Sequence, residues 1–219
     1  MKLEVVSSKK KVSGEVAAVV DLFEKGLQTF HVRKNHYSKK KLRKYLRQIP
    51  KEYHSRIILH SHQSLALWFK VKGVLFSTRQ VEKGGYYLRT KLMLKIFRRK
   101  TLICRGYDNL SDLLAEKKRY DFVVLNPVLD SISEDPTATA FSQRAIESCI
   151  ENSVLKVHAL GGVKSTNLSM LYKMGFKGAI LNAQIWDDRE NRIANFVEAK
   201  LVLERIVDPE NIKLRKVAG

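Results

Sequence analysis

The stretch Val157-His158-Ala159-Leu160-Gly161-Gly162-Val163 decides how this chain is expected to fold. Its apolar run is typical of a buried strand, and that strand ends in two glycines. A second such run, Gly178-Ala179-Ile180-Leu181-Asn182-Ala183, follows a helical pattern. Small residues at the carboxyl end of a parallel strand leave backbone N–H groups open to a phosphate group. The sequence therefore predicts a phosphate site at the ends of two neighbouring strands, formed by Gly161, Gly162, Asn182 and Ala183.

Another strand pattern, Tyr120-Asp121-Phe122-Val123-Val124-Leu125-Asn126-Pro127, runs into a segment rich in hydroxyl side chains. That segment contains Ser131 and Ser133, and it is long enough to fold over the end of a barrel. Serine hydroxyls can donate hydrogen bonds to phosphate oxygens. We expect Ser131 and Ser133 to face the same opening as the paired glycines.

Apolar, β-rich runs alternate with helical patterns along the whole chain, which is typical of βα units and a parallel sheet. Eight such units in 219 residues favour a single closed (β/α)8 TIM barrel over residues 1–219, with a polar tail from about residue 206. The last helix is expected over residues 191–205. The predicted strands are 3–6, 28–33, 56–60, 73–76, 101–104, 121–125, 155–159 and 178–182. In such barrels the loops after strands seven and eight commonly hold phosphate.

The segment 81–100 is expected to form the fourth helix. Leu88, Leu92 and Ile96 recur at every fourth position, so they share one helix face. With its basic residues, this stripe could lie on a membrane. Its place inside a βα repeat instead favours a helix of the outer ring. Trp68 and Trp186 are expected on helix faces in the core.

The composition is that of a folded protein with a strongly basic first half. Hydrophobic residues make up 44% of the chain, which is enough for a full core. Residues 1–100 carry 25 Lys and Arg against 6 Asp and Glu, whereas residues 101–219 carry 16 of each kind. This charge could attract anionic substrates, nucleic acid or a membrane surface. Solvated helix faces are the simpler interpretation, which we favour.

The remaining composition favours a cytoplasmic location. No apolar run approaches the roughly 20 residues needed to span a bilayer, and no signal-peptide pattern is present. Cys104 and Cys149 lack disulfide or metal-site spacing. We expect a phosphorylated small molecule as ligand, no membrane partner and no nucleic-acid partner, because no recognition motif accompanies the charge. A homodimer is compatible with the sequence.

Several motifs, taken in order, resemble the thiamine phosphate synthase superfamily, which includes the thiazole tautomerases. They are His31-Val32-Arg33-Lys34 on strand two, the segment from Asn126 to Ser133, the turn 159–163 and the junction 175–179. The resemblance extends from Val5 to about Trp186. It implies a transferase of thiamine biosynthesis that joins a pyrimidine diphosphate to a thiazole phosphate, releases pyrophosphate and uses Mg²⁺ as cofactor. It also implies that Ser131 and Ser133 are the paired hydroxyls of the phosphate site.

The side that would hold the diphosphate departs from the family pattern. His60-Ser61 stands where the family has an Asn-Asp pair, Ser77-Thr78-Arg79-Gln80 contains no carboxylate, and Glu134 replaces a lysine. Mg²⁺ usually binds one or two carboxylates, so its expected ligands are absent and no metal ligand is assigned. The segment 104–107 also lacks the histidine that a tautomerase would need. The alternative function is therefore a relative that binds a phosphorylated ligand without catalysis.

His31, Arg33 and His60 are the candidate catalytic residues. They fall near the carboxyl ends of strands two and three, where barrel enzymes keep their chemistry. His31 and Arg33 are two residues apart on one strand, so their side chains point to the same side and are well placed for an anionic ligand. His60 and His62 could bind Zn²⁺ only with a third ligand, which the sequence does not show, so a hydrogen-bonded polar rim is favoured.

Overall fold

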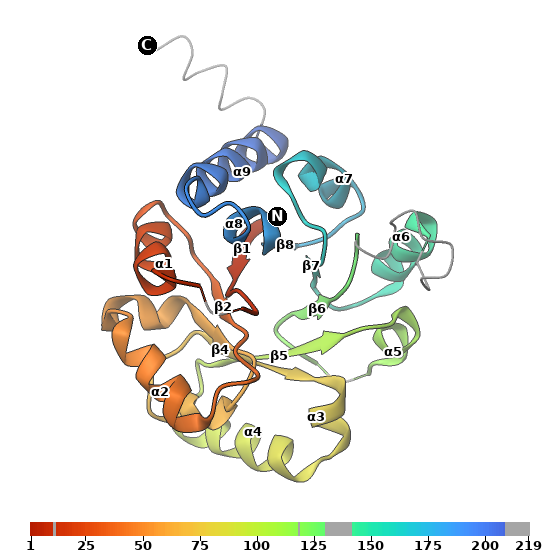
Figure 1. The fold of residues 1–219 in the computed structure, drawn as a ribbon. Coiled ribbons are helices and arrows are strands. Elements are labelled where there is room, and N and C mark those ends of the chain that lie inside the picture. Colours follow the sequence, from red (N-terminus) through yellow and green to blue (C-terminus); the bar gives the residue numbers. More distant parts are fainter. Residues whose placement is uncertain (11, 118, 130–141, 209–219) are drawn as a thin grey trace.

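Parallel strands close into an eight-stranded barrel ringed by helices, so the predicted TIM barrel is confirmed (Figure 1). The computed structural model describes residues 1–10, 12–117, 119–129 and 142–208. Each strand pairs with its neighbours in sequence, and β8 pairs with β1 to close the sheet. The strands are β1 (Lys2–Val6), β2 (Phe30–Val32), β3 (Ile57–Leu59), β4 (Gly73–Ser77), β5 (Leu102–Tyr107), β6 (Val123–Leu125), β7 (Val157–Leu160) and β8 (Gly178–Leu181).

The helices lie between successive strands and cover the outside of the barrel (Figure 1). The α-helices are α1 (Glu15–Glu24), α2 (Lys39–Gln48), α3 (Thr78–Glu82), α4 (Gly85–Phe97), α5 (Leu110–Ala115), α6 (Gln143–Asn152), α7 (Leu168–Lys173), α8 (Ala183–Trp186) and α9 (Arg192–Val207). Short 3₁₀ helices are η1 (Lys51–Arg56), η2 (Gln63–Leu67) and η3 (Ser165–Asn167). After β3 the chain forms the short 3₁₀ helix η2 rather than an α-helix.

Serine side chains define where several helices begin. Ser38 Oγ accepts a hydrogen bond from the Lys41 amide at 3.2 Å, and Ser77 forms a reciprocal capping box with Gln80 at the start of α3. These bonds satisfy N–H groups that have no acceptor within the helix. The capping box fixes the point at which β4 turns into α3, and this point lies at the carboxyl end of the barrel.

The sheet separates two apolar cores. The larger core lies between the strands and the helices, and a smaller one fills the barrel. Inward-facing residues of alternate strand positions form the smaller core, namely Val6, Ile58, Leu75, Cys104, Phe122, Val124, Leu160 and Ile180. Glu4, His31 and His158 are also buried and alternate with outer-core neighbours on their strands, which places their side chains inside the barrel. The barrel interior is therefore only partly apolar.

The segment 81–100 forms two helices rather than the single one expected. α3 ends at Glu82, and Gly84, whose φ is 69°, precedes α4. A positive φ is readily adopted by glycine and breaks the helical path. The Gly84-Gly85 pair is therefore the stop signal that the apolar periodicity concealed.

The apolar stripe of α4 faces solvent, so the expectation that it packs on the barrel was wrong. Leu88, Leu92 and Ile96 are 62%, 58% and 53% exposed. The helix is instead anchored by another face, whose buried members are Tyr87, Thr90 and Leu94. Trp68 is also 73% exposed and not in the core, because η2 ends just before it. Trp186 is buried as predicted.

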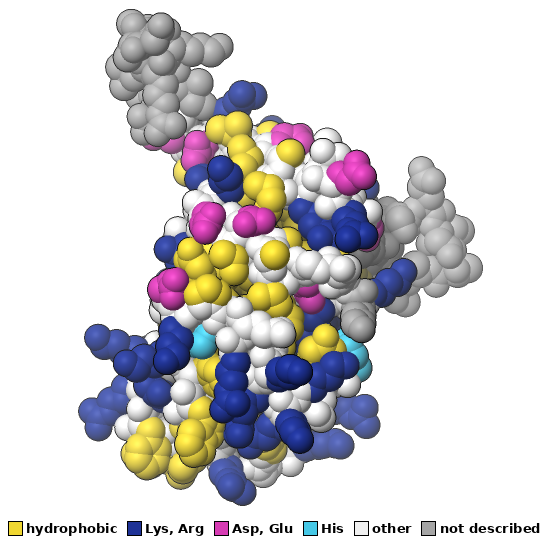
Figure 2. Space-filling model, turned by 60° about the vertical axis from the view of Figure 1, so that its left-hand side comes forward, with side chains coloured by type: hydrophobic (Ala, Val, Ile, Leu, Met, Phe, Trp, Pro, Cys, Tyr) yellow, Lys and Arg dark blue, Asp and Glu magenta, His cyan; other side chains and the backbone are white. Residues whose placement is uncertain are grey.

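The charge asymmetry of the sequence is visible on the surface. In Figure 2, Lys and Arg side chains crowd the lower part of the molecule, where α2 and α4 lie in Figure 1, and most acidic side chains lie nearer α9. α9 continues to Val207, slightly beyond the expected start of the tail. No helix among the described residues is long and apolar enough to cross a bilayer.

Candidate active site

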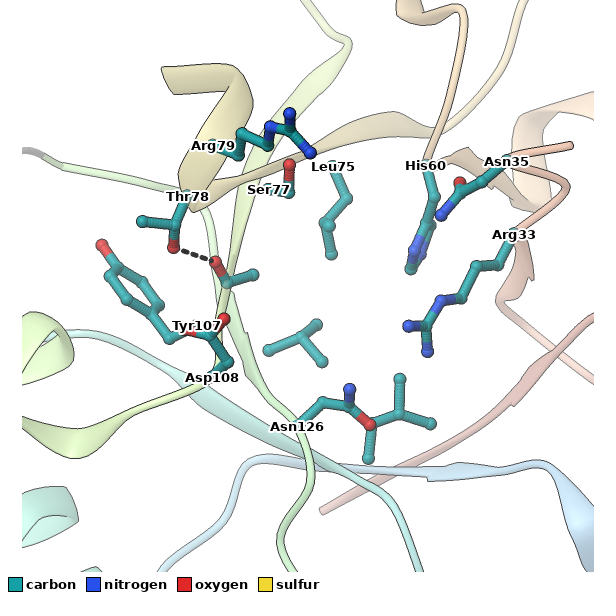
Figure 3. A pocket seen from close by; sticks show the side chains of 13 residues that line it. Arg33, Asn35, His60, Leu75, Ser77, Thr78, Arg79, Tyr107, Asp108 and Asn126 are labelled. Carbon is teal, nitrogen blue, oxygen red and sulfur yellow. Dashed lines mark hydrogen bonds between the residues drawn. The ribbon is translucent and has the colours of Figure 1, made fainter. Parts of the chain in front are cut away.

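A pocket opens at the carboxyl end of the barrel, where the predicted site residues were expected (Figure 3). We call it the mouth pocket; its cavity volume is about 220 Å³. Residues at or just after the ends of β2 to β7 line it, so each strand contributes to one shared hollow. The lining residues are Arg33, Asn35, His60, Leu75, Ser77, Thr78, Arg79, Gly106, Tyr107, Asp108, Val124, Asn126 and Leu160.

Two arginines give the mouth pocket its positive charge. Arg33 follows β2, and its backbone N–H donates to Ser7 Oγ at 2.9 Å, which ties the end of β2 to β1. Arg79 lies in the first turn of α3, whose start is fixed by the capping box at Ser77. Within the described part of the chain, neither guanidinium takes part in an ion pair. Both therefore have free donors suited to phosphate oxygens.

The opposite wall carries neutral donors and one carboxylate. Thr78 Oγ1 donates to the Gly106 carbonyl at 3.1 Å (Figure 3). Tyr107 donates to the carboxylate of Glu116 at 2.7 Å, and burial together with this bond raises the pKa of Tyr107 far above its ordinary value. Tyr107 is therefore an uncharged phenol at neutral pH. Asp108 follows directly and contributes an exposed carboxylate to the pocket.

A chain of hydrogen bonds runs from the barrel centre to the mouth pocket. Glu4 Oε2 lies 3.1 Å from His31 Nε2 and 2.9 Å from His158 Nδ1. His31 Nδ1 in turn lies 2.9 Å from Nε2 of His60, which lines the pocket. Glu4 and His31 are only 2% and 0% exposed. Of these four residues, only His60 lines the pocket, so only His60 can contact a ligand there.

The charges of this chain follow from its environment. Burial raises the pKa of Glu4, but the hydrogen bonds from His158 and His31 outweigh it and hold the pKa well below its ordinary range. Glu4 is therefore an anion at neutral pH. Burial lowers the pKa of His60 well below its ordinary value, and the positive charge of Arg33 acts in the same direction. His60 is therefore neutral at neutral pH.

The loops after β7 and β8 lie side by side, as the sequence predicts. The Ser165 amide donates to Gln184 Oε1 at 2.8 Å, and Gln184 Nε2 donates to Ser165 Oγ at 3.1 Å, so the two loops are directly joined. Gly162 has a φ of 66°, and its amide has no acceptor among the described residues. Ala183 begins α8, where N–H groups lack an intrahelical acceptor. These amides are available to an anion.

Gly161 allows close packing of the chain, whereas its neighbour Gly162 offers an amide to an anion. A Cβ atom at this position would lie 2.9 Å from the Pro127 Cα atom, and its φ of 99° disfavours other residues. The Leu129 amide donates to the Gly161 carbonyl at 3.1 Å. Gly161 therefore allows the segment after β6 to cross close over the end of β7.

The structure brings some predicted residues together and separates others. Arg33 and His60 line the mouth pocket. His31 is fully buried beneath it, so it cannot contact an anionic ligand directly. Gly161 and Gly162 follow Leu160, which lines the pocket, but neither these glycines nor Asn182 and Ala183 line it themselves. Ser131, Ser133 and Glu134 lie outside the described residues.

Sequence reasoning missed the role of Lys34 and of Arg79 and Asp108. Lys34 is fully buried and pairs with Glu15 at 2.7 Å, so it is not available to a ligand. Arg79 and Asp108 both line the pocket. The signal that could have found them is their position directly after β4 and β5, the rule that identified Arg33 and His60.

The described residues do not form a complete metal site. No group of three or more His, Cys, Asp or Glu residues in this part of the chain could hold a metal ion. Asp108 is the single carboxylate among the residues that line the mouth pocket. His60 and His62 find no third ligand of this kind among the described residues, so they do not form a zinc site there. The donor set does not fit a protein-held Mg²⁺ ion, whose usual ligands are oxygens with one or two carboxylates.

Comparisons with known proteins agree with the geometry. Residues 3–185 match the family model of thiamine monophosphate synthase, TMP-TENI. No curated protein sequence matches the chain. A thiamine phosphate pyrophosphorylase from Bacteroides thetaiotaomicron has a similar structure, with a TM-score of 0.73, 24% identity, and coverage of 94% of this chain and 98% of that one. A thiamine phosphate pyrophosphorylase from Pyrococcus furiosus gives 0.73 and 20%, with coverage of 94% and 96%.

Structures of other enzymes also share this fold. A (S)-3-O-geranylgeranylglyceryl phosphate synthase from Thermoplasma acidophilum, in complex with sn-glycerol-1-phosphate, gives a TM-score of 0.67 at 13% identity and covers 94% of this chain and 93% of that one. At such identities the structural likeness shows the fold alone. The family match spans most of the chain and includes the strand ends that form the mouth pocket. On that match, the chain belongs to the thiamine monophosphate synthase family.

Proposed function

We propose that this protein acts in thiamine biosynthesis by binding and processing phosphorylated thiazole and pyrimidine precursors in the mouth pocket. The observation that carries the proposal is the pair of arginines at the pocket wall, Arg33 and Arg79, which form no ion pair within the described part of the chain. The family match gives the substrate class.

Each part of the mouth has a defined task in this proposal. The amides of Gly162 and Ala183 bind the phosphate of one precursor, as helix N-termini and glycine turns commonly do. Arg33 and Arg79 bind the second anionic group. His60 is a neutral acid–base group at the pocket wall, and Asn126 orients the ligand from the β6 side. These roles need only groups of this chain.

Mg²⁺ would stabilise the charge that develops on departing pyrophosphate when it is bound. Among the described residues that line the pocket, Asp108 is the only carboxylate for such an ion, so we derive no step through the metal. This shortage favours a second candidate function, in which the protein binds the phosphorylated ligand without coupling the two precursors. Both functions use the same anion-binding groups.

Calorimetric titration with pyrimidine diphosphate and, separately, with thiazole phosphate, together with a coupling assay in Mg²⁺, tests the proposal. We expect both precursors to bind the wild-type protein, and Arg33→Gln to lose at least tenfold in affinity for pyrimidine diphosphate, which corresponds to about 1.4 kcal/mol. Arg47→Gln, which alters an exposed arginine of α2, is the matched control. Binding without turnover would assign the second function, and no binding of either precursor would contradict both.

The compartment and the extent of the functional unit are part of the same proposal. We propose a cytoplasmic protein in which the whole chain acts as one barrel. Cys104 and Cys149 are both free and buried, which agrees with a reducing compartment.

A further inference from the structure

The hydrogen-bonded chain from Glu4 to His60 has no role in binding a phosphate group. It is nonetheless buried, fully connected and ends at the mouth pocket. We propose that His60 Nδ1 is the proton-accepting group of the mouth pocket, and that Glu4 and His31 are positioning residues that hold it in this state. The inference rests on the proposed function only for the phosphorylated nature of the ligand.

The hydrogen positions follow from the acceptor at the buried end. An ionised carboxylate can only accept hydrogen bonds, so His31 must carry its proton on Nε2, which faces Glu4. In a neutral imidazole the other nitrogen, Nδ1, is then an acceptor. His60 Nε2 faces that acceptor and must therefore be the donor. This leaves His60 Nδ1 with a free lone pair.

The free nitrogen belongs to a side chain that reaches the ligand space. His60 lines the pocket and points toward the same hollow as Arg33 (Figure 3). No hydrogen bond to His60 Nδ1 is made within the described part of the chain, and the atom is not among the buried, unsatisfied ones. A ligand anion held by Arg33 would therefore bring its neighbouring atoms next to an unprotonated nitrogen.

The barrel interior is built to keep Glu4 in place. His158 donates to the same oxygen, Oε2, and its ring stacks on Phe122 with centroids 4.1 Å apart and planes 8° from parallel. A Cβ atom at Gly178 would collide with the His158 ring, so this glycine makes room for it. Glu4 is thus fixed from both sides, by His31 of β2 and His158 of β7.

The proton transfer balances without a metal or a leaving group. A bond between hydrogen and a carbon, nitrogen or oxygen atom of the ligand breaks, and its electron pair stays on the ligand. The proton moves to His60 Nδ1, and the proton on His60 Nε2 moves to His31 Nδ1. The positive charge then lies on His31, beside the Glu4 carboxylate, which stabilises it. Reprotonation of the ligand at the same or another atom reverses the path.

Charged groups around His60 favour the accepting state before the ligand binds. Burial lowers the pKa of His60, and the positive charge of Arg33, which lies beside it at the pocket wall, acts in the same direction. Glu4 acts in the opposite direction through His31. An imidazole that stays neutral near pH 7 is ready to take a proton.

Nuclear magnetic resonance of the full chain labelled with ¹⁵N-histidine tests the assignment directly. Long-range ¹H–¹⁵N spectra distinguish protonated from unprotonated ring nitrogens, and His60→Gln identifies the signals of His60. We expect His60 to carry its proton on Nε2 between about pH 7 and 8, near the working range of a histidine base. A proton on Nδ1 over this range would overturn the proposal even without further variants.

Two ring-preserving variants separate positioning from packing. His31→Phe removes the link between Glu4 and His60, and we expect His60 to become a mixture of tautomers. His158→Phe removes a hydrogen bond to the same carboxylate but lies outside the path, so the tautomer of His60 should stay unchanged. An unchanged tautomer in folded His31→Phe would remove the positioning role.

A chemical probe covers the case in which His31→Phe does not fold. Diethyl pyrocarbonate reacts with unprotonated imidazole nitrogen, and peptide mass spectrometry reports each histidine separately. We expect His60 to react in the wild-type protein, inorganic phosphate to slow that reaction, and His31 to be protected. Absence of reaction at His60 would contradict an accessible lone pair. If phosphate no longer protects His60 in Arg33→Gln while the His60 tautomer is unchanged, Arg33 binds the phosphate and His60 remains the proton acceptor.

Discussion

On the β7–β8 side of the barrel mouth the predicted ligand groups belong to the backbone and do not line the mouth pocket, whereas on the β2–β5 side they are side chains that line it. Gly162 and Ala183 offer amides that local turn geometry exposes. Arg33, His60 and Asp108 depend instead on which residue follows each strand. The backbone side has glycine and other small residues after its strands, and the side-chain side has histidine and hydroxyl residues where the resemblance to the family implies carboxylates. Phosphate binding and metal-assisted chemistry can therefore be lost separately.

The largest expected effect concerns the side-chain half of this comparison. We expect coupling of pyrimidine diphosphate to thiazole phosphate, with Mg²⁺ present, to be weak or absent, well below the roughly 1 s⁻¹ of ordinary enzymes. Steady-state measurement of pyrophosphate release checks this. Turnover near that value would mean that another group holds the metal. Asp108→Asn would then be the first variant to test, because Asp108 lines the pocket, whereas Glu82 does not and Glu134 lies outside the described residues.

Glu4 joins the two sides, since His31 comes from β2 and His158 from β7. Replacing Glu4 by Ala leaves two buried imidazoles without their common acceptor. We expect the free energy of unfolding to fall by about 3 kcal/mol, as when one partner of a buried charged pair is removed. Urea unfolding measures this, with Glu24→Ala on the exposed face of α1 as the matched control. A loss equal to that of the control would mean that the network contributes nothing to stability.

Gly161 tests how tightly the backbone half is built. Gly161→Ala should lower the free energy of unfolding by about 2 kcal/mol, because the new methyl group meets Pro127 and the residue keeps a positive φ. Gly14→Ala is the matched control: its φ of 70° imposes similar strain, but no atom lies within 4 Å of its Cβ. Thermal unfolding of both variants should show the larger loss at Gly161. Equal losses would attribute the whole effect to backbone strain.

The sequence was sufficient for the barrel and for the residues that follow correctly placed strand ends. β2 and β3 end close to where the apolar runs end, so Arg33 and His60 were found. β5 was expected to end at Cys104 but continues to Tyr107. Arg105 and Tyr107 can occupy a strand because both bind Glu116, which their polarity alone does not reveal. Asp108, which directly follows the longer strand, was consequently not recognised as a residue at a strand end.

The burial of His31 could not be predicted for a similar reason. Its partner, Glu4, lies on another strand, and a strand pattern shows which face a residue takes but not what it meets there. The prediction that the apolar stripe of α4 packs on the barrel was wrong because Tyr87 and Leu94 supply a second apolar face. Apolar periodicity alone does not show which of two such faces is buried. In each case tertiary partners, rather than local pattern, decided the outcome.

The smallest expected effect is the pH dependence of stability that His60 imposes. Its pKa in the folded protein lies below the ordinary value of 6.5, so between these two values the unfolded chain binds more protons than the folded one. The free energy of unfolding should therefore be highest above pH 6.5 and fall below it, by up to about 1.4 kcal/mol per pH unit. The pKa of Glu4 is also lowered, but it affects stability only below its ordinary value of 4.5, so the two groups act over different pH ranges.

Urea unfolding between pH 7 and 5 measures this dependence. The free energy of unfolding should change less steeply with pH in His60→Gln than in the wild-type protein, while His36→Gln, which alters an exposed histidine, should keep the wild-type pH dependence. If His60→Gln left the slope unchanged, His60 would take up protons equally in both states. That result would contradict the lowered pKa, and therefore the neutral state, of His60 at the mouth pocket.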